Sequence, residues 1–315
     1  MSKKGKNIDT SVDFAGIKLK VPVLTASGTF GYGDELLDLL DVNQLGGMIT
    51  KSITPLPRKG NPPERIVETD AGMLNAIGLA NIGLDRFIKE KIPVLEKLET
   101  NIIVNVAGET IEDYVTVIEK LCEYECIAGF ELNVSCPNVK QGGISFGTEP
   151  ENIKRITEKV KTAAGDKPLI VKLSPNVTNI SAIALSAVNA GADALSLVNT
   201  FTAMAIDIKT QSPVLANNTG GLSGPAIKPI ALYMVNKVYK EVCCKYNIPV
   251  MGLGGIRNAS DVIEFMLAGA SAVAVGCWNF VNPACTIEIT EGIEKYCRDN
   301  NIEKISKLTG ALKES

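Results

Sequence analysis

The chain contains the stretch Phe130-Glu131-Leu132-Asn133-Val134-Ser135-Cys136-Pro137-Asn138, in which an apolar run ends abruptly in polar residues. The apolar part is typical of a buried strand, and the polar residues with Gly142, Gly143 and Gly147 after them predict a mobile loop. Because the chain has no histidine, proton transfer would need another side chain. The thiol of Cys136 is the leading candidate.

Seven other short runs share the apolar character of this strand. None alternates strictly between apolar and polar residues, which favours strands that are covered on both faces. With the first stretch included, the eight predicted strands are residues 21–26, 48–51, 102–106, 130–133, 169–173, 194–198, 250–253 and 272–275.

The segments between these runs show helical spacing. One predicted helix has an apolar face formed by Ile111, Val115, Ile118 and Leu121. Ser260 or Asp261 is a candidate cap for a later helix, and Gly191 and Gly269 are candidate helix ends.

Eight strand–helix units predict a (β/α)8 TIM barrel, with residues 1–315 as one domain. A doubly wound open sheet is the alternative. Polar residues favour the barrel, because they stand at the carboxyl ends of six strands, which a barrel gathers at one mouth: Ser27, Lys51, Asn105, Asn133, Lys172 and Asn199. Long insertions at 53–85, 134–150 and 201–229 would lie on the same face.

Composition excludes several classes of protein. The 315 residues are 45% hydrophobic and 21% charged, with a net charge of -3, so the chain lacks the basic footprint of a nucleic-acid binder. No apolar run predicts a signal peptide or a membrane span, so we expect a cytoplasmic protein. Eight cysteines without histidine predict free thiols and no metal site.

Glycines follow the last two predicted strands. The seventh strand ends in Gly252-Leu253-Gly254-Gly255-Ile256, and the eighth is followed by Gly276-Cys277. Glycine lets backbone N–H groups approach an anion, and barrels often bind phosphate after strands seven and eight. Ordinary turns also use glycine, but the paired position favours a phosphate site.

Lys51 and Lys172 end apolar strands, where an unpaired ammonium group is costly. Each could simply extend to solvent. Alternatively, each is a fixed cation facing an electron-rich ligand, and flavin mononucleotide (FMN) fits this reading, with Asn105 and Asn133 nearby. A GxGxxG motif is absent near the N-terminus, which argues against a Rossmann-bound dinucleotide.

Several motifs together resemble dihydroorotate dehydrogenase, and specifically the catalytic subunit of the NAD-linked class 1B enzymes. These motifs are Ala-Ser-Gly-Thr-Phe-Gly at 26–31, Thr-Lys-Ser-Ile-Thr at 50–54, Asn-Ala-Ile-Gly-Leu at 75–79, Asn-Val-Ser-Cys-Pro-Asn at 133–138, Val-Lys-Gln-Gly-Gly at 139–143, Leu-Ala-Asn at 215–217 and Thr-Gly-Gly-Leu-Ser-Gly-Pro at 219–225. The resemblance extends from about residue 12 to about residue 282.

The resemblance implies a barrel that holds FMN and oxidises (S)-dihydroorotate to orotate in pyrimidine synthesis. Cys136 would remove the C5 proton while hydride leaves C6 for flavin N5. Substrate binding is implied for Lys51, Asn75, Ala76, Ile77, Gly78, Leu79, Asn133, Asn199 and Thr200. FMN binding is implied for Ser27, Lys51, Ser52, Asn105, Asn133, Lys172, Val198, Gly224, Gly254, Gly255, Gly276 and Cys277.

The same resemblance implies a partner subunit that carries FAD and a 2Fe–2S cluster and passes electrons to NAD, in a heterotetramer of two catalytic and two electron-transfer chains. Two departures from the family pattern are Ala203, in the segment after Thr200, and Cys277. Two alternatives stay open: a fumarate-using homodimer of class 1A type, and a non-catalytic barrel that binds phosphate.

Overall fold

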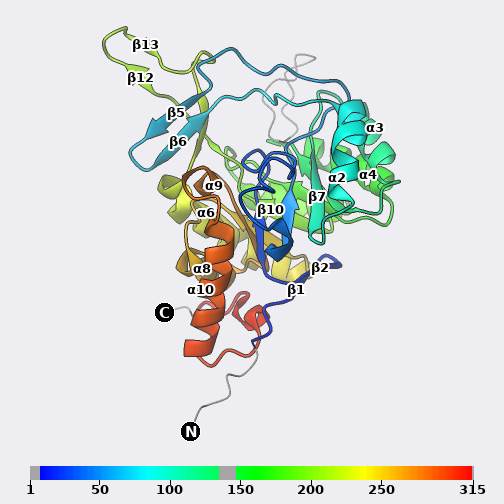
Figure 1. The fold of residues 1–315 in the computed structure, drawn as a ribbon, viewed down its shortest axis with the longest axis vertical. Coiled ribbons are helices and arrows are strands. Elements are labelled where there is room, and N and C mark those ends of the chain that lie inside the picture. The colour runs from blue at the N-terminus through cyan, green and yellow to red at the C-terminus, as the bar shows by residue number, and fades with distance from the viewer. Residues whose placement is uncertain (1–7, 135–146, 314–315) are drawn as a thin grey trace.

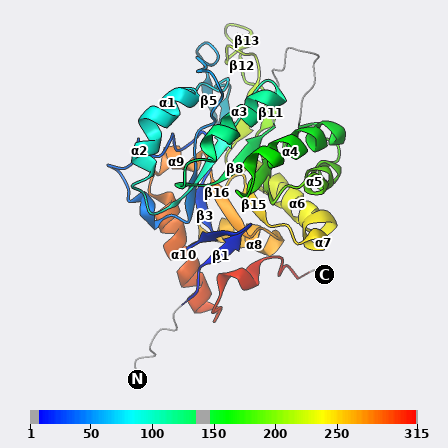
Figure 2. The same ribbon diagram turned by 90° about the vertical axis from the view of Figure 1, so that its right-hand side faces the viewer.

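Eight parallel strands form a closed barrel in the computed structural model, which describes residues 8–134 and 147–313 (Figures 1 and 2). The strands follow one another around the ring in chain order, and the last pairs with the first through Val273 and Val23. The (β/α)8 barrel is therefore confirmed. Its strands are β3 (Val23–Thr25), β4 (Gly47–Ile49), β7 (Asn101–Val106), β8 (Ile127–Asn133), β9 (Leu169–Lys172), β10 (Ala194–Leu197), β15 (Val250–Leu253) and β16 (Ala272–Val275).

All eight predicted strands are present, and two of them, β15 and β16, have the predicted ends. The other six differ at one or both ends. The clearest case is β3, which was expected from residue 21 but begins at Val23. Pro22 precedes it and has no backbone N–H to donate to a neighbouring strand, so the strand begins at the next residue, Val23.

Helices surround the barrel. The longer ones are α3 (Ile111–Leu121), α4 (Pro150–Ala164), α5 (Ile180–Asn189), α6 (Lys228–Val238), α8 (Ala259–Ala268) and α10 (Cys285–Asp299). Short helical turns are α1 (Leu84–Arg86), α2 (Ile92–Leu95), α7 (Cys244–Tyr246) and α9 (Trp278–Val281). None of the helices within the described residues has the length and hydrophobicity to cross a bilayer.

The buried face of α3 differs from the expected one. Tyr114 and Val117 are fully buried, whereas Ile111 and Val115 are only partly buried. The reason is the tyrosine, whose ring fills the core while its hydroxyl donates a hydrogen bond to the carbonyl of Asn133, 3.0 Å away. The helix is thereby attached to the end of β8.

The predicted cap of α8 is wrong. The N-cap is Asn258, whose side chain accepts from the backbone N–H of Asp261, while the Asp261 carboxylate accepts from the Asn258 N–H. Asp261 is therefore the second member of a capping box and Ser260 has no part in it. Gly269 ends α8 and Gly191 lies just beyond α5, both at positive φ, as predicted.

Two of the long insertions contain a second sheet that the sequence did not indicate. Its strands are antiparallel in the order β11 (Phe201–Ala203), β14 (Gly220–Ser223), β6 (Gly72–Asn75) and β5 (Ile66–Thr69). A further hairpin, β12 (Ile206–Asp207) with β13 (Ser212–Pro213), projects beyond it (Figure 1). This sheet has its own small apolar cluster, which includes Leu74, Ala76 and Leu215.

The opposite end of the barrel is covered by a hairpin of β1 (Val12–Phe14) and β2 (Ile17–Leu19). The Asn101 side chain, at the start of β7, donates to the carbonyl of Lys18 in that hairpin. Phe14 and Leu19 are fully buried. One end of the barrel is thus closed by apolar packing, and the end below the second sheet carries the polar residues.

Replacing Asn258 with Ala should lower the free energy of unfolding by about 1 kcal/mol, because loss of the capping side chain leaves the backbone N–H of Asp261 without its acceptor. The measurement is the thermal midpoint of the purified protein. Ser260→Ala is the matched control and should change stability by less than about 0.5 kcal/mol. A larger loss for Ser260→Ala than for Asn258→Ala would contradict the observed cap.

Candidate active site

A cavity of about 620 Å³ lies at the carboxyl end of the barrel, between the strand ends and the antiparallel sheet. Its volume is in the range of small-molecule and cofactor sites. Among the described residues, its lining includes four cationic side chains and no carboxylate; the cations are Lys51, Arg58, Lys172 and Arg257. Six asparagines also line it: Asn61, Asn75, Asn133, Asn176, Asn199 and Asn217. Such a lining favours an anionic ligand with several hydrogen-bonding groups.

The cavity brings together nearly all of the residues selected from the sequence. Those that line it are Ser27, Lys51, Ser52, Asn75, Ala76, Ile77, Gly78, Leu79, Asn133, Lys172, Val198, Asn199, Thr200, Gly224, Gly254, Gly255, Gly276 and Cys277. Cys136, Gly142 and Gly143 lie outside the described residues. The roles of these residues remain predictions, but their convergence on one cavity is observed.

Asn105 is the exception, because it is fully buried and does not line the cavity. It was expected at the rim because it stands one residue before the end of the predicted strand 102–106, and β7 does end at Val106. Side chains along a barrel strand point alternately into the packed interior and outward toward the helices. Asn105 lies beneath the cavity, and its Oδ1 accepts from the hydroxyl of Ser52, 2.5 Å away.

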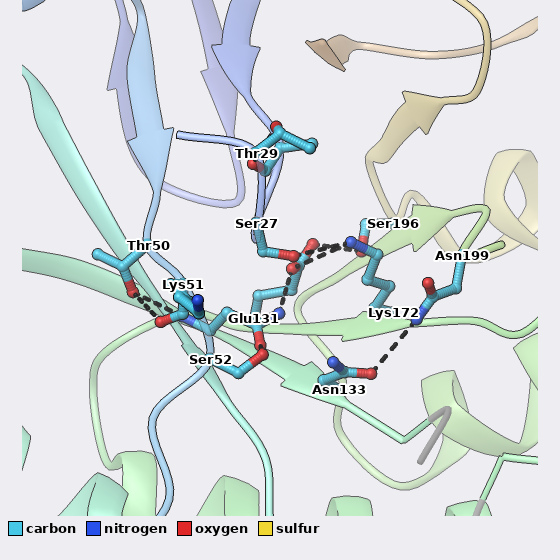
Figure 3. Close-up of polar contacts among 12 residues, drawn as sticks. Ser27, Thr29, Thr50, Lys51, Ser52, Glu131, Asn133, Lys172, Ser196 and Asn199 are labelled. Atoms are coloured by element: carbon cyan, nitrogen blue, oxygen red, sulfur yellow. Dashed lines mark hydrogen bonds and ion pairs between the residues drawn. The ribbon is translucent and has the colours of Figure 1, made fainter. Parts of the chain in front are cut away.

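Two asparagines on neighbouring parts of the rim contact each other (Figure 3). The Asn199 amide nitrogen lies 3.3 Å from Oδ1 of Asn133, and Oδ1 of Asn199 accepts from the backbone N–H of Thr200 at 2.9 Å. These two bonds fix which end of the Asn199 amide faces which neighbour. The rim therefore presents oriented amides, as recognition of a planar polar ring requires.

Lys172 is almost completely buried, yet it is not isolated. Its ammonium nitrogen lies 3.1 Å from the hydroxyl of Ser27 and 3.6 Å from the carboxylate of Glu131, which is fully buried (Figure 3). Glu131 is not among the predicted site residues, although an acidic residue within the apolar stretch Phe130 to Leu132 is a signal. A buried cation needs such a partner.

Lys51 is half-buried at the rim, and burial lowers the pKa of its ammonium group below the ordinary value of 10.5. Two nearby charges act in opposite directions, since Glu35 raises this pKa and Arg65 lowers it further. Burial is the larger cause, because it removes water from the charged form. Lys51 is thus a cation whose charge the site stabilises poorly until an anion binds.

Two glycines on the rim, Gly255 and Gly276, differ in what an added side chain would meet. Gly255 has a φ of +72°, and a Cβ there would lie 2.8 Å from the carbonyl oxygen of Gly224. Gly276 is different, because a Cβ would meet nothing closer than the Ala26 side chain at 3.9 Å and would stand in open cavity space. Side chains at these positions would distort or fill the place where backbone groups face the cavity.

The two departures from the family pattern lie in ordered surroundings. Ala203 is in β11, opposite Gly220 of β14. Cys277 lines the cavity, where burial raises the pKa of its thiol and a hydrogen bond with Ser223 lowers it by a smaller amount. Within the described residues, no three His, Cys, Asp or Glu side chains are grouped closely enough to hold a metal ion.

Comparison with known proteins identifies the family. A family model described as dihydroorotate dehydrogenase matches residues 10–297. The chain belongs to the dihydroorotate dehydrogenase family. This family membership confirms the resemblance carried by the sequence motifs.

Similar proteins over the full length are catalytic subunits of dihydroorotate dehydrogenase B (NAD(+)). The one from Geotalea uraniireducens is 55% identical over 304 residues, which cover 96% of this chain and 98% of the relative. The one from Thermoanaerobacter sp. is 51% identical over 306 residues, covering 97% and 99%.

The ammonium group of Lys51 should titrate below 10.5, because its burial disfavours the charged form. The titration can be followed by NMR after reductive methylation with isotope-labelled formaldehyde, with the resonance assigned by its loss in Lys51→Arg. Glu35→Gln should lower the Lys51 pKa further, and Arg65→Gln should raise it. A Lys51 resonance that titrates above 10.5 would contradict the observed burial.

Proposed function

We propose that this chain is the FMN-dependent catalytic subunit that oxidises (S)-dihydroorotate to orotate in pyrimidine biosynthesis. The observation that carries the proposal is the cavity lining, which in the described residues combines four cations and six asparagine amides with no carboxylate. Orotate and its precursor are carboxylates with ring amides, and FMN is a phosphate ester with a polar ring. Both ligands match this lining in charge and hydrogen bonding.

The residues present fit FMN. Gly254, Gly255 and Gly276 line the cavity at the ends of β15 and β16, where a phosphate group would bind, and an added Cβ at Gly276 would have open space around it. Lys172 and Ser27 would hold the ring side, because their polar atoms already contact each other on the cavity wall. When bound, FMN would supply the acceptor for the hydride that leaves the substrate.

The substrate would bind between Lys51 and the amides of the rim. Asn133 and Asn199 contact each other, so their side-chain amides have a fixed relative orientation on the cavity wall. Residues 75–79 line the same cavity. Lys51 would regain a stable charge by pairing with the substrate carboxylate, since its own surroundings disfavour the ammonium form.

The proton acceptor in this proposal is the Cys136 thiol, which lies outside the described residues. The described lining has no carboxylate, the chain has no histidine, and burial raises the pKa of the Cys277 thiol. Val134, just before Cys136, is buried beside Gly147, where an added Cβ would lie 2.7 Å from the Val134 carbonyl. Val134 and Gly147, the described residues on either side of 135–146, therefore lie close together next to Asn133.

Cys136→Ala should keep FMN bound and reducible by other donors, yet lose dihydroorotate oxidation by about a hundredfold or more, because the general base is gone. Stopped-flow bleaching of the flavin under anaerobic conditions measures this step. Cys244→Ala, which removes an exposed thiol, is the control and should bleach at the normal rate. Normal bleaching in Cys136→Ala would show that Cys136 is not the base. If the unmodified protein binds phosphate but does not oxidise dihydroorotate, the non-catalytic alternative is supported.

The relatives are named as catalytic subunits of a NAD(+) enzyme. We extend this to a partner subunit with FAD and a 2Fe–2S cluster, in a heterotetramer with two copies of each chain. A cytoplasmic location is part of the same proposal, and it is supported by free thiols at all seven described cysteines, as is usual in a reducing compartment.

The purified chain should reduce NAD slowly or not at all by itself and rapidly after its native partner is added, because the partner would carry the electrons. Absorbance of NADH gives the rate. Fumarate should remain a poor acceptor in both preparations. Rapid turnover with fumarate by the chain alone would instead favour the homodimeric class 1A alternative.

A further inference from the structure

Glu131 forms the centre of a polar cluster beneath the cavity. Its carboxylate accepts from Nδ2 of Asn105 at 2.6 Å and from the hydroxyl of Ser196 at 2.8 Å, on its two different oxygens. The ammonium of Lys172 lies 3.6 Å away. The four residues come from neighbouring strands β7, β8, β9 and β10, so the cluster spans half of the barrel. Figure 3 shows Glu131, Lys172 and Ser196.

Stability alone does not account for this cluster. Glu131, Asn105 and Ser196 are fully buried and Lys172 nearly so, and moving such charges out of water costs free energy. Apolar side chains of similar volume often stabilise a core as well or better. Glu131 does not line the cavity either, so it cannot touch a ligand there. Its action has to pass through its neighbours.

One neighbour is the Asn105 amide. An ionised carboxylate only accepts hydrogen bonds, so Asn105 must turn its NH2 group toward Glu131. Its Oδ1 then faces the Ser52 hydroxyl, 2.5 Å away, and Ser52 lines the cavity. Glu131 thereby determines, through Asn105, how Ser52 is held on the cavity wall.

The other neighbour is Lys172, whose ammonium reaches the cavity beside Ser27. With the carboxylate 3.6 Å below it, the positive charge seen from the cavity is partly compensated. Without Glu131, the same lysine would present a full positive charge to any ligand above it.

We propose that Glu131 is a positioning residue that sets the charge and hydrogen bonding of the cofactor floor through Lys172 and Asn105. This inference rests on the proposed FMN function. Because it partly compensates the charge of Lys172 on the cavity wall, Glu131 would limit how strongly bound FMN is stabilised in its reduced, more negative form. Transfer of electrons to a further carrier would then stay favourable.

The test is the midpoint potential of bound FMN in Glu131→Gln, which keeps the volume and an acceptor for Asn105 but removes the charge. At a given applied potential, the ratio of reduced to oxidised flavin should be about tenfold higher than in the unmodified protein. This corresponds to a midpoint potential raised by about 30 mV for a two-electron couple. Spectroelectrochemical titration gives the potential. Ser196→Ala is the matched control, because it removes one hydrogen bond to Glu131 and keeps both charges, and its potential should equal that of the unmodified protein.

The outcomes separate the two proposals. An unmodified protein that takes up no FMN overturns the proposed function and this inference with it. Normal FMN binding with an unchanged or lowered potential in Glu131→Gln overturns the inference alone. If Glu131→Gln does not fold, Glu131→Gln combined with Lys172→Gln should fold, because it leaves no unpaired charge. Failure of the double variant to fold also overturns the inference.

Discussion

Closure of the parallel barrel is the constraint on which the rest depends. When β16 pairs with β3, all eight strands point the same way around one ring, and their carboxyl ends share one rim. Residues far apart in the chain, such as Ser27 and Lys172, come within 3.1 Å for this reason alone. An open sheet would have spread the same strand ends along an edge. The cavity is thus a consequence of the topology, and its chemistry is a consequence of which residues stand at the strand ends.

The barrel interior also supplies charge where it is costly. Lys172 and Glu131 are both buried, and each lowers the cost of burying the other. Asn105 and Ser196 each donate a hydrogen bond to one oxygen of the carboxylate. The core is therefore apolar toward the helices and the β1–β2 end, and polar directly below the cavity. This division keeps the floor rigid, because each polar group is held by a partner on another strand.

The sequence predicted the barrel strands well, because buried parallel strands are continuous apolar runs. It did not predict β5, β6, β11 and β14, which are three or four residues long and are completed by pairing between two distant insertions. Two of them, β6 and β14, also contain glycine, which is uncommon in strands. The end of β7 was predicted correctly, but Asn105 was placed at the rim because it stands one residue before that end, whereas its side chain is buried beneath the cavity. Glu131 was overlooked because its partner is on another strand, and pairing of that kind depends on register rather than on local pattern. Asn258 was missed as a cap since Ser260 and Asp261 are equally good capping residues by type.

The order of strands in the ring relates the anion site to the predicted base. Gly276 follows β16, and residues 135–146, which include Cys136, follow the end of β8, which stands four strands away in a ring of eight and so directly across the barrel. A ligand bound by its phosphate near Gly255 and Gly276 and extending toward Asn133 would cross the mouth of the barrel. Its two ends would then meet different strand ends. The barrel therefore fixes the distance between the predicted anion site and the amides of the opposite rim, because both stand on strands of one closed ring.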